Sequence, residues 1–265
     1  MRLENCDGEH RPARRSRGLG VRLCPDALTN DNAANACSQE KDMKIGIIGA
    51  GNIGGTLTRR LTSLGHDVAV ANSRGPETLA KLAAETGATA VTVEEAAKGR
   101  DLVVVTIPLK NVPDLPEGLF DNSPDELVVV DTSNYYPQQR DGLIQEIENG
   151  VPESRWVEKN LGRPVVKAFN NIYAQHLLER GKPAGTSGRI ALPVAGDDPG
   201  AKAVVMTLVD QLGFDPVDAG SLDTSRRQQP GTPVYATDYD VEGVRRALSE
   251  AKPDRTAEWR ATPTR

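Results

Sequence analysis

Cysteine is nearly absent from this chain of 265 residues, and its three copies all lie within the first 37 positions. The long stretch that follows therefore excludes a disulfide framework and a thiolate metal site. Histidine is equally scarce: His10, His66 and His176 are scattered, without the spacing typical of metal ligands. We expect no metal site, and the lack of disulfides favours a cytoplasmic location.

Long hydrophobic runs and an excess of positive charge are also missing. The longest apolar stretches, such as 103–107, have the length of buried strands, whereas crossing a bilayer takes about 18–20 residues. The formal net charge of −5 argues against a general nucleic-acid binder, which usually presents a basic face. We therefore expect neither a membrane nor a nucleic acid as a partner.

Both ends of the chain lack apolar periodicity. Residues 1–42 contain a cluster of arginines but no apolar segment of a secretory signal, which predicts a disordered N-terminal extension. A second hypothesis is that Met43 is the native start, because the first predicted strand follows it directly. Residues 252–265 are polar and are predicted to form a disordered tail.

Between these ends, short apolar runs alternate with helical periodicity, which is typical of a doubly wound α/β fold with a mostly parallel sheet. Pro76 is expected in the first turn of a helix that runs past Leu82. A helix at 241–247 carries a stripe with Val244 and Leu248, and it either packs back on the core or serves an interface. Further helices are predicted at 53–64 and 201–212, and about eight strands at 44–49, 68–71, 89–93, 101–107, 127–131, 165–169, 190–194 and 216–218.

A glycine pattern joins the first strand to the first helix. Gly49, Gly51 and Gly54 form G-x-G-x-x-G, with Asn52 and Ile53 between the last two glycines. In a dinucleotide-binding turn, the first glycine permits the tight bend, the second lets the backbone approach the pyrophosphate and the third lets helix and strand pack closely. The free N–H groups at the start of the helix would then bind the phosphates. The pattern predicts a Rossmann domain.

The end of the second predicted strand indicates which dinucleotide is bound. NAD enzymes usually place a carboxylate there to hold the ribose 2′-hydroxyl. This chain has Asn72, Ser73 and Arg74 instead, followed by Gly-Pro. A serine can donate to a 2′-phosphate and an arginine can pair with it, whereas a carboxylate would repel it. We therefore predict NADP(H) as the cofactor.

With these motifs, the sequence resembles the NADPH-dependent coenzyme F420 reductases (F420:NADP oxidoreductases), whose nucleotide domain is shared by the STEAP metalloreductases. The resemblance also rests on VVKAFNN at 165–171, LPVAGDD at 192–198, DAGSL at 218–222, and Ser225 with Arg226. It covers about residues 43–226, with the motifs in order.

The resemblance implies an NADP-binding Rossmann domain over 43–222 that includes parts of the substrate cleft, and a C-terminal loop and helix at 223–251 that close the cleft. It implies hydride exchange with coenzyme F420 and a homodimer. Carried over by position, Ile107, Pro108 and Asn134 would border the nicotinamide. The second-substrate side would be lined by Asn170, Ile172, Pro193, Gly220 and Leu222, although Pro108, Ile172 and Leu222 could equally serve the core.

Two departures from the family fall on the second-substrate side. F420-using members carry a histidine where Asn170 stands, and residues 227–235 form a polar loop instead of an apolar final helix. Another acceptor, such as a flavin, a quinone or a metal chelate, is therefore the main alternative within the same enzyme class. We name no catalytic acid or base, because hydride transfer between two ring cofactors needs none from the protein.

Two further readings remain. Lys167 and Asn171 have the one-turn spacing used by β-hydroxyacid dehydrogenases, but they begin in a β-type run. About 40 residues follow Leu222, which is too few for the long helical domain of those enzymes. A non-catalytic NADP-binding redox sensor, or a subunit of a larger reductase, is the alternative outside enzymes.

Overall fold

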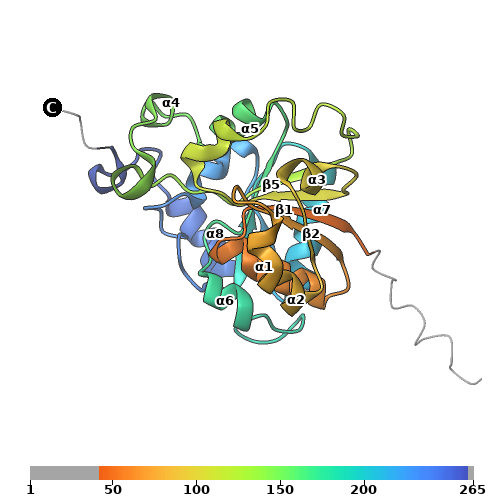
Figure 1. Cartoon of the computed structure of the whole chain (residues 1–265). Helices are drawn as coiled ribbons and strands as arrows, with labels where there is room; N and C mark the ends of the chain where they lie inside the picture. Colours follow the sequence, from red (N-terminus) through yellow and green to blue (C-terminus); the bar gives the residue numbers. More distant parts are fainter. Residues whose placement is uncertain (1–41, 262–265) are drawn as a thin grey trace, which may run out of the picture. The chain divides into compact units, whose positions relative to one another are not determined.

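The computed structural model describes residues 42–261, and its main feature is a parallel sheet of six strands in the order β3-β2-β1-β4-β5-β6 (Figure 1). The described part does not include residues 1–41 of the expected N-terminal extension or residues 262–265 of the expected tail. The order and the parallel pairing confirm the α/β, Rossmann-type fold class. The strands are β1 (Lys44–Ile48), β2 (Asp67–Ala71), β3 (Thr89–Ala90), β4 (Leu102–Val105), β5 (Val128–Asp131) and β6 (Val166–Lys167).

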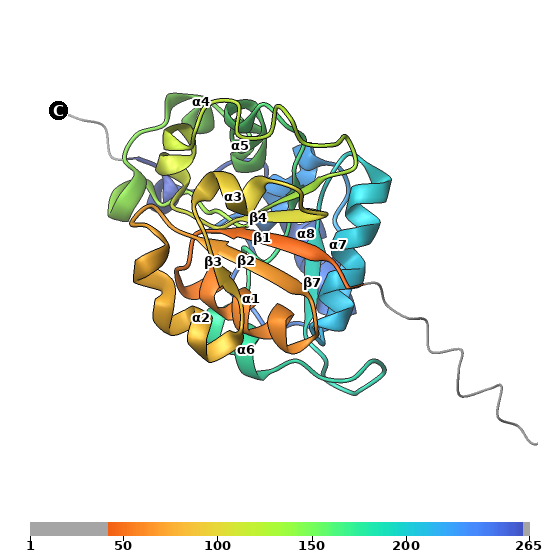
Figure 2. The same cartoon turned by 45° about the vertical axis from the view of Figure 1, so that its right-hand side comes forward.

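Helices cover both faces of this sheet, which is why its strands are continuous in Val and Ile (Figure 2). Leu57 and Leu61 of α1 (Asn52–Ser63) pack with Ile45 on one face, where α7 (Pro199–Gln211) also lies. On the other face, α3 (Val93–Ala97) packs against Val103. The remaining helices of the described chain are α2 (Ala80–Thr86), α4 (Gln145–Glu148), α5 (Glu153–Leu161), α6 (Ala174–Glu179) and α8 (Val241–Glu250).

The expectation of one sheet of about eight strands is wrong. β7 (Ala191–Val194) and β8 (Asp215–Asp218) pair with each other as a separate parallel sheet. A single antiparallel bridge, Lys167 to Ala195, connects them to β6. Because β7 runs against β6 and meets it at one residue pair, it does not extend the parallel ladder. The chain also turns sharply just after β6, where Phe169 has a φ of +60°.

Helix α8 packs back on the small sheet, which decides between the two roles left open for it. Val244, Ala247 and Leu248 are buried and share an apolar cluster with Ala191 of β7 and Val217 of β8. The apolar stripe predicted from the sequence is therefore buried against the small sheet of the same chain.

Two predicted elements around the second and third strands have different bounds. The strand predicted at 89–93 ends at Ala90, because Thr92 instead caps α3 and forms a reciprocal capping box with Glu95. The helix expected at Pro76 begins as the 3₁₀ turn η1 (Pro76–Leu79) before α2 follows.

The last described segment, 252–261, is ordered by long-range contacts, so the expectation of a disordered tail is wrong for these residues. Arg255 pairs with Glu153, and the Trp259 ring packs against Tyr136 and Tyr235. Such contacts are single side chains reaching distant elements, which polar composition alone does not reveal. Across residues 42–261, no helix combines the length and apolar character that a membrane span requires.

Candidate functional site

The three glycines of the β1–α1 turn differ in how much space surrounds them. A Cβ on Gly49, which has a φ of +110°, would lie 2.3 Å from the Thr106 carbonyl oxygen, and one on Gly54 would lie 1.8 Å from the Gly49 carbonyl oxygen. The fold itself therefore requires both glycines. A Cβ on Gly51 would meet nothing within 4 Å. The bare backbone at Gly51 thus serves no internal packing and leaves a free surface at the start of α1.

Helix α1 begins at this surface without a cap. Gly51 is its N-cap residue, no side chain among the described residues bonds to the first turn, and no acidic residue lies in that turn. The first N–H groups of a helix have no partners within it, so Asn52, Ile53 and Gly54 present donors at the positive end of the helix dipole. The turn adjoins a cavity of about 560 Å³, and a second hollow of about 820 Å³ runs along α1. This geometry suits a phosphate-containing ligand.

The turn after β2 is organised by Asn72. Its Oδ1 accepts from the Arg74 backbone N–H at 2.8 Å, and its Nδ2 donates to the Thr78 hydroxyl at 2.9 Å. Ser73 and Arg74 are exposed, and within residues 42–261 neither side chain forms a hydrogen bond or ion pair. Both line the 560 Å³ cavity, and Arg74 also lines the hollow along α1. The two side chains are therefore free to contact a ligand beside the α1 N-terminus.

Sequence reasoning missed two further cations along the same hollow. Arg59 and Lys81 line it together with Arg74. Arg59 is engaged by Glu85 through two hydrogen bonds of 2.6 and 2.8 Å, and this arginine holds the pKa of Glu85 below its usual value. Helical spacing alone gave no signal for them, because Arg59 and Lys81 come to line the same hollow only where α1 and α2 pack together.

The residues expected to border the nicotinamide lie at the carboxyl ends of β4 and β5. Ile107 and Pro108 are half-buried and line the 560 Å³ cavity. Asn134 is three residues beyond β5 and forms two hydrogen bonds with Asn170. Its Nδ2 donates to the Asn170 carbonyl at 2.8 Å, and its Oδ1 accepts from the Asn170 Nδ2 at 3.0 Å. The structure thus brings the ends of three neighbouring strands together.

On the second-substrate side, both N–H groups of the Asn170 amide are already hydrogen-bonded. Its Nδ2 also donates to the Gln228 carbonyl at 2.7 Å, and its Oδ1 accepts from the Gln228 Nε2 at 3.0 Å. Gln228 reaches the Pro193 carbonyl as well. Asn170 is only 4% exposed. Gln228 belongs to the polar loop that sequence analysis placed on the second-substrate side, but its contact with Asn170 was not predicted.

The other residues expected on that side are mostly core. Ile172 and Leu222 are buried in the two main apolar clusters, and Pro193 is buried on β7. Gly220 is half-buried, with a φ of +92° that favours glycine. In this conformation these groups present little surface, so contact with a second substrate stays a prediction and requires the cleft to open.

A buried ion pair lies beneath the Asn134 turn. Lys167 and Asp131 are fully buried and paired at 3.1 Å, and Asp131 also accepts from the Ser154 hydroxyl and the Ser133 N–H. Lys167 further donates to the Ser133 carbonyl. The lysine therefore holds the turn in place and has no free side toward the cleft. Since β6 ends at Lys167, Asn171 does not follow it on a helix, which argues against the dehydrogenase reading.

A second buried pair ties the C-terminal segment to α5. Glu153 is fully buried and pairs with Arg255, while its other carboxylate oxygen contacts no donor in the described chain. Burial raises the pKa of Glu153, and Arg255 and Lys167 oppose that effect. Arg255 also lies over the Tyr135 ring at 5.0 Å. Burial raises the pKa of Tyr135 to about 12, so its hydroxyl stays protonated.

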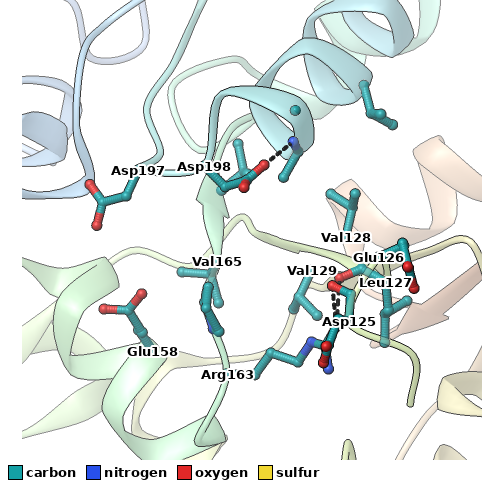
Figure 3. Close-up of a pocket in the computed structure, with 15 residues that line it drawn as sticks. Asp125, Glu126, Leu127, Val128, Val129, Glu158, Arg163, Val165, Asp197 and Asp198 are labelled. Atoms are coloured by element: carbon teal, nitrogen blue, oxygen red, sulfur yellow. Dashed lines mark hydrogen bonds between the residues drawn. The ribbon is translucent and has the colours of Figure 1, made fainter.

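Another hollow, of about 430 Å³, lies at the amino ends of β5 and β6 (Figure 3). Its rim carries Asp197 and Asp198, and Asp198 caps α7. Arg163 there donates to the carbonyls of Asp125 and Leu127. Ligands of open α/β sheets bind at the carboxyl ends of the strands, and no predicted site residue lines this hollow. Within residues 42–261 no group of three or more His, Cys, Asp or Glu side chains could hold a metal ion.

Comparisons with known proteins identify a family for the part of the chain that contains the glycine turn. Residues 44–135, which hold the glycine turn and Asn134, match the family described as NADP oxidoreductase, coenzyme F420-dependent. The Escherichia coli K12 protein YjhV is 51% identical over 90 residues, which are 34% of this chain and 58% of that protein. The chain therefore spans little more than half of the length of this curated relative.

Two solved structures extend the likeness along the chain. The hypothetical protein SMa0349 of Sinorhizobium meliloti is 31% identical with a TM-score of 0.64, covering 76% of this chain and 97% of the other. A protein of Arthrobacter sp. FB24, provisionally named an F420-dependent NADP reductase, is 26% identical with a TM-score of 0.56, covering 69% and 87%. From the glycine turn, the sheet order and these matches together, the chain belongs to the family of coenzyme F420-dependent NADP oxidoreductases.

Proposed function

We propose that this chain transfers a hydride between NADP(H) and a second ring cofactor, and that this cofactor is coenzyme F420. The observation that carries the proposal is the surface formed along two cavities by Gly51, the start of α1, Ser73 and Arg74, whose side chains have no partner among residues 42–261. Family membership supports the reaction class.

Preference for NADP(H) over NAD(H) follows from the charges after β2. Ser73 and Arg74 offer a donor and a planar cation to a 2′-phosphate. No carboxylate occupies the Asn72–Arg74 positions where an NAD enzyme would bind the 2′-hydroxyl. Two acidic side chains, Glu94 and Asp114, do line the cavity. They belong to α3 and to η2 (Leu109–Asp114), however, and not to the turn after β2 where an NAD enzyme carries its carboxylate.

In this reaction the protein holds the dinucleotide and the acceptor ring in position. The bound dinucleotide supplies the hydride, and the first turn of α1 holds its phosphates. Ile107 and Pro108 limit where the nicotinamide can lie and keep that end of the cavity apolar. Reaction requires donor and acceptor carbons about 3–3.5 Å apart and shielded from water. Lys167 and Asp131 contribute by fixing the turn that carries Asn134.

A specific observation favours a different acceptor as the second candidate. The Asn170 amide is fully occupied by Asn134 and Gln228, so it offers no donor to a polar ring edge in this conformation. An acceptor that needs few hydrogen bonds, such as a quinone or a flavin ring, would tolerate this better than one that depends on the amide.

Acceptor-dependent oxidation of NADPH by the purified chain tests the proposal. Coenzyme F420, FMN, menadione and ferric citrate are offered in turn, with NADH replacing NADPH in a parallel series. We expect F420 to be reduced fastest and NADH to serve poorly. Reduction of FMN or menadione but not F420 would support the second candidate. No turnover with any acceptor, despite tight NADPH binding, would favour a sensor or subunit.

A further inference from the structure

The hollow of about 820 Å³ along α1 is positively charged in a chain whose formal net charge is −5. Its lining comes from α1, α2 and the first turns of α6, and Figure 1 shows α2 and α6 on either side of α1. Three cations line it: Arg59, Arg74 and Lys81. Among the described residues of the lining, Glu85 supplies the only carboxylate. The 430 Å³ hollow has the reverse balance, with five acidic residues and Arg163. The charge along α1 is therefore local, and it favours an anionic ligand.

Two of these cations, Lys81 and Arg59, have hydrogen-bonding capacity left for a ligand. Lys81 is exposed, and within residues 42–261 its ammonium forms no hydrogen bond or ion pair. Arg59 uses three of the five N–H groups of its guanidinium, two on Glu85 and one on the Gly55 carbonyl. Two N–H groups of Arg59 thus remain without a partner in the described chain. Because Glu85 already fixes the direction of the guanidinium, Arg59 loses little side-chain freedom when it binds an anion.

The dinucleotide does not account for this hollow. Ser73, expected at the 2′-phosphate, lines the 560 Å³ cavity and not the hollow along α1. The same holds for Ile107 and Pro108, which are expected at the nicotinamide. The two spaces meet at Gly51 and Arg74, which line both. A dinucleotide that runs along the first cavity therefore leaves the other two cations of the hollow without an anion.

One side of the hollow leads to the residues expected around the acceptor. Tyr173, Ala174 and Gln175 line the hollow at the start of α6. They follow Asn170 by three to five positions, and Asn170 contacts Asn134 beyond the carboxyl end of β5. The Tyr173 side chain is exposed. An acceptor whose ring faces the nicotinamide near Asn134 can therefore extend a side chain past Tyr173 and along α1.

We propose that the hollow along α1 binds an anionic side chain of the electron acceptor, and that Lys81 and Arg59 contact its phosphate or carboxylate groups. The proposal rests on the proposed function for the existence of a ring acceptor, but not on the identity of the ring. Coenzyme F420 carries a phosphodiester and glutamate carboxylates on its side chain, so it offers several anions to these cations. FMN offers one phosphate, and menadione offers none. The hollow then selects among acceptors by their side chains.

Equilibrium dialysis of the full chain with two matched pairs of oxidised ligands tests the site. The first pair is coenzyme F420 and its deazariboflavin core, which has the same ring without the phosphate and the glutamates. The second pair is FMN and riboflavin, which differ by one phosphate. NADP⁺ is present at saturation, so that no hydride is available and binding is measured without turnover. We expect F420 to bind at least about tenfold more tightly than its core, and high salt to reduce this difference by screening the charges.

Lys81→Ala shows whether the hollow is the place of binding. Loss of this ammonium should weaken the binding of F420 by about 3- to 5-fold, and Lys81→Glu should weaken it further, with little change for the core. The NADPH dissociation constant should stay unchanged, and an equal loss of NADPH affinity would mean that Lys81 contacts the 2′-phosphate instead. Lys98→Ala is the matched control, because Lys98 is an exposed lysine at the end of α3 and lines none of the cavities described above.

The outcomes separate this proposal from the proposed function. If F420 binds through Lys81 but NADPH does not reduce it, the anion site stands and hydride transfer to F420 is refuted. If only FMN depends on Lys81, the site stands with a flavin as the acceptor. Equal or absent binding within both pairs, or a difference that Lys81→Ala leaves unchanged, would overturn the anion site even if the enzyme reduces F420.

Discussion

Arg74 is the residue that we propose decides between NADP(H) and NAD(H). Its backbone is held by Asn72, but its guanidinium has no partner among the described residues. A charge-assisted hydrogen bond contributes about 1.5–3 kcal/mol, which corresponds to about 10- to 150-fold in affinity. We therefore expect Arg74→Ala to raise the dissociation constant for NADPH by that factor and to leave the constant for NADH nearly unchanged. Fluorescence titration of both nucleotides measures this.

The matched control is Arg245→Ala, which removes an exposed arginine from α8 at no described cavity. It should alter neither constant. Equal losses of NADPH and NADH affinity in Arg74→Ala would contradict the assignment of a 2′-phosphate contact.

The buried pair of Glu153 and Arg255 makes a prediction about stability and pH. Arg255→Ala leaves a buried carboxylate without its cation, and breaking such a pair costs about 3–5 kcal/mol. Burial already raises the folded-state pKa of Glu153 above its ordinary value, and losing Arg255 raises it further. The folded state then binds a proton that the unfolded state releases, so stability falls as pH rises through this window. Urea unfolding should show a larger cost for Arg255→Ala at about pH 8 than at about pH 5.

A second substitution checks the cause. Adding Glu153→Gln to Arg255→Ala removes the stranded charge, so the double variant should regain part of the lost stability at the higher pH. A pH-independent cost, or no recovery in the double variant, would mean that the loss comes from packing of the arginine over Tyr135 instead.

Single residues could be placed in the fold from the sequence where a short motif fixes their local position. Gly49, Gly54 and the Ser73–Arg74 pair stand where the motifs placed them. Sequence reasoning did not find the pairing of Gln228 with Asn170, or that of Glu153 with Arg255 across 102 positions. Those partners are far apart in the chain, and only tertiary folding shows that they meet.

The β1–α1 turn provides a prediction at the scale of one element. Gly51 has an ordinary φ of −74° and open space around it, so Gly51→Ala should leave thermal stability unchanged. The added methyl would stand where a pyrophosphate approaches, so the NADPH dissociation constant should rise at least about tenfold.

Gly54→Ala is the contrasting variant on the same turn. Its Cβ would overlap the Gly49 carbonyl, so the protein itself should lose about 1–3 kcal/mol of stability. Thermal melts with and without NADPH separate the two variants. If Gly51→Ala lowered the melting temperature of the free protein as much as Gly54→Ala, Gly51 would serve the fold and not a ligand.

The predicted elements were wrong where a β-type run overlapped a helix-capping pattern, and where the sheet that a strand joins depended on the direction of the strand. The run TAVTV at 89–93 has strong β propensity, but Thr92 is followed three residues later by Glu95 and begins α3 instead. β7 and β8 were found as strands, yet apolar runs do not encode which sheet a strand joins. That choice follows from the turn at Phe169 and the antiparallel bridge at Lys167.

At the scale of the whole molecule, the described chain has two unequal sides. The side with Gly51 and Arg74 is open, with two cavities along it, whereas Gln228 closes the side around Asn170. The open side could be predicted because short motifs encode it. For the closed side, the resemblance implied that the loop and helix at 223–251 close the cleft, but the contact of Gln228 with Asn170 could not be predicted, because it joins residues 58 positions apart. We infer that acceptor binding requires movement of the chain beyond Arg226.

Direct transfer of a labelled hydride tests the central claim. NADPH carrying deuterium at the transferred position of its nicotinamide is mixed with the protein and oxidised coenzyme F420, and the reduced F420 is analysed by mass spectrometry. We expect the deuterium to arrive on the deazaflavin ring without exchange with water, because the two rings would react face to face in a shielded cleft. Deuterium lost to the solvent, or F420 left oxidised while NADPH is bound, would contradict it.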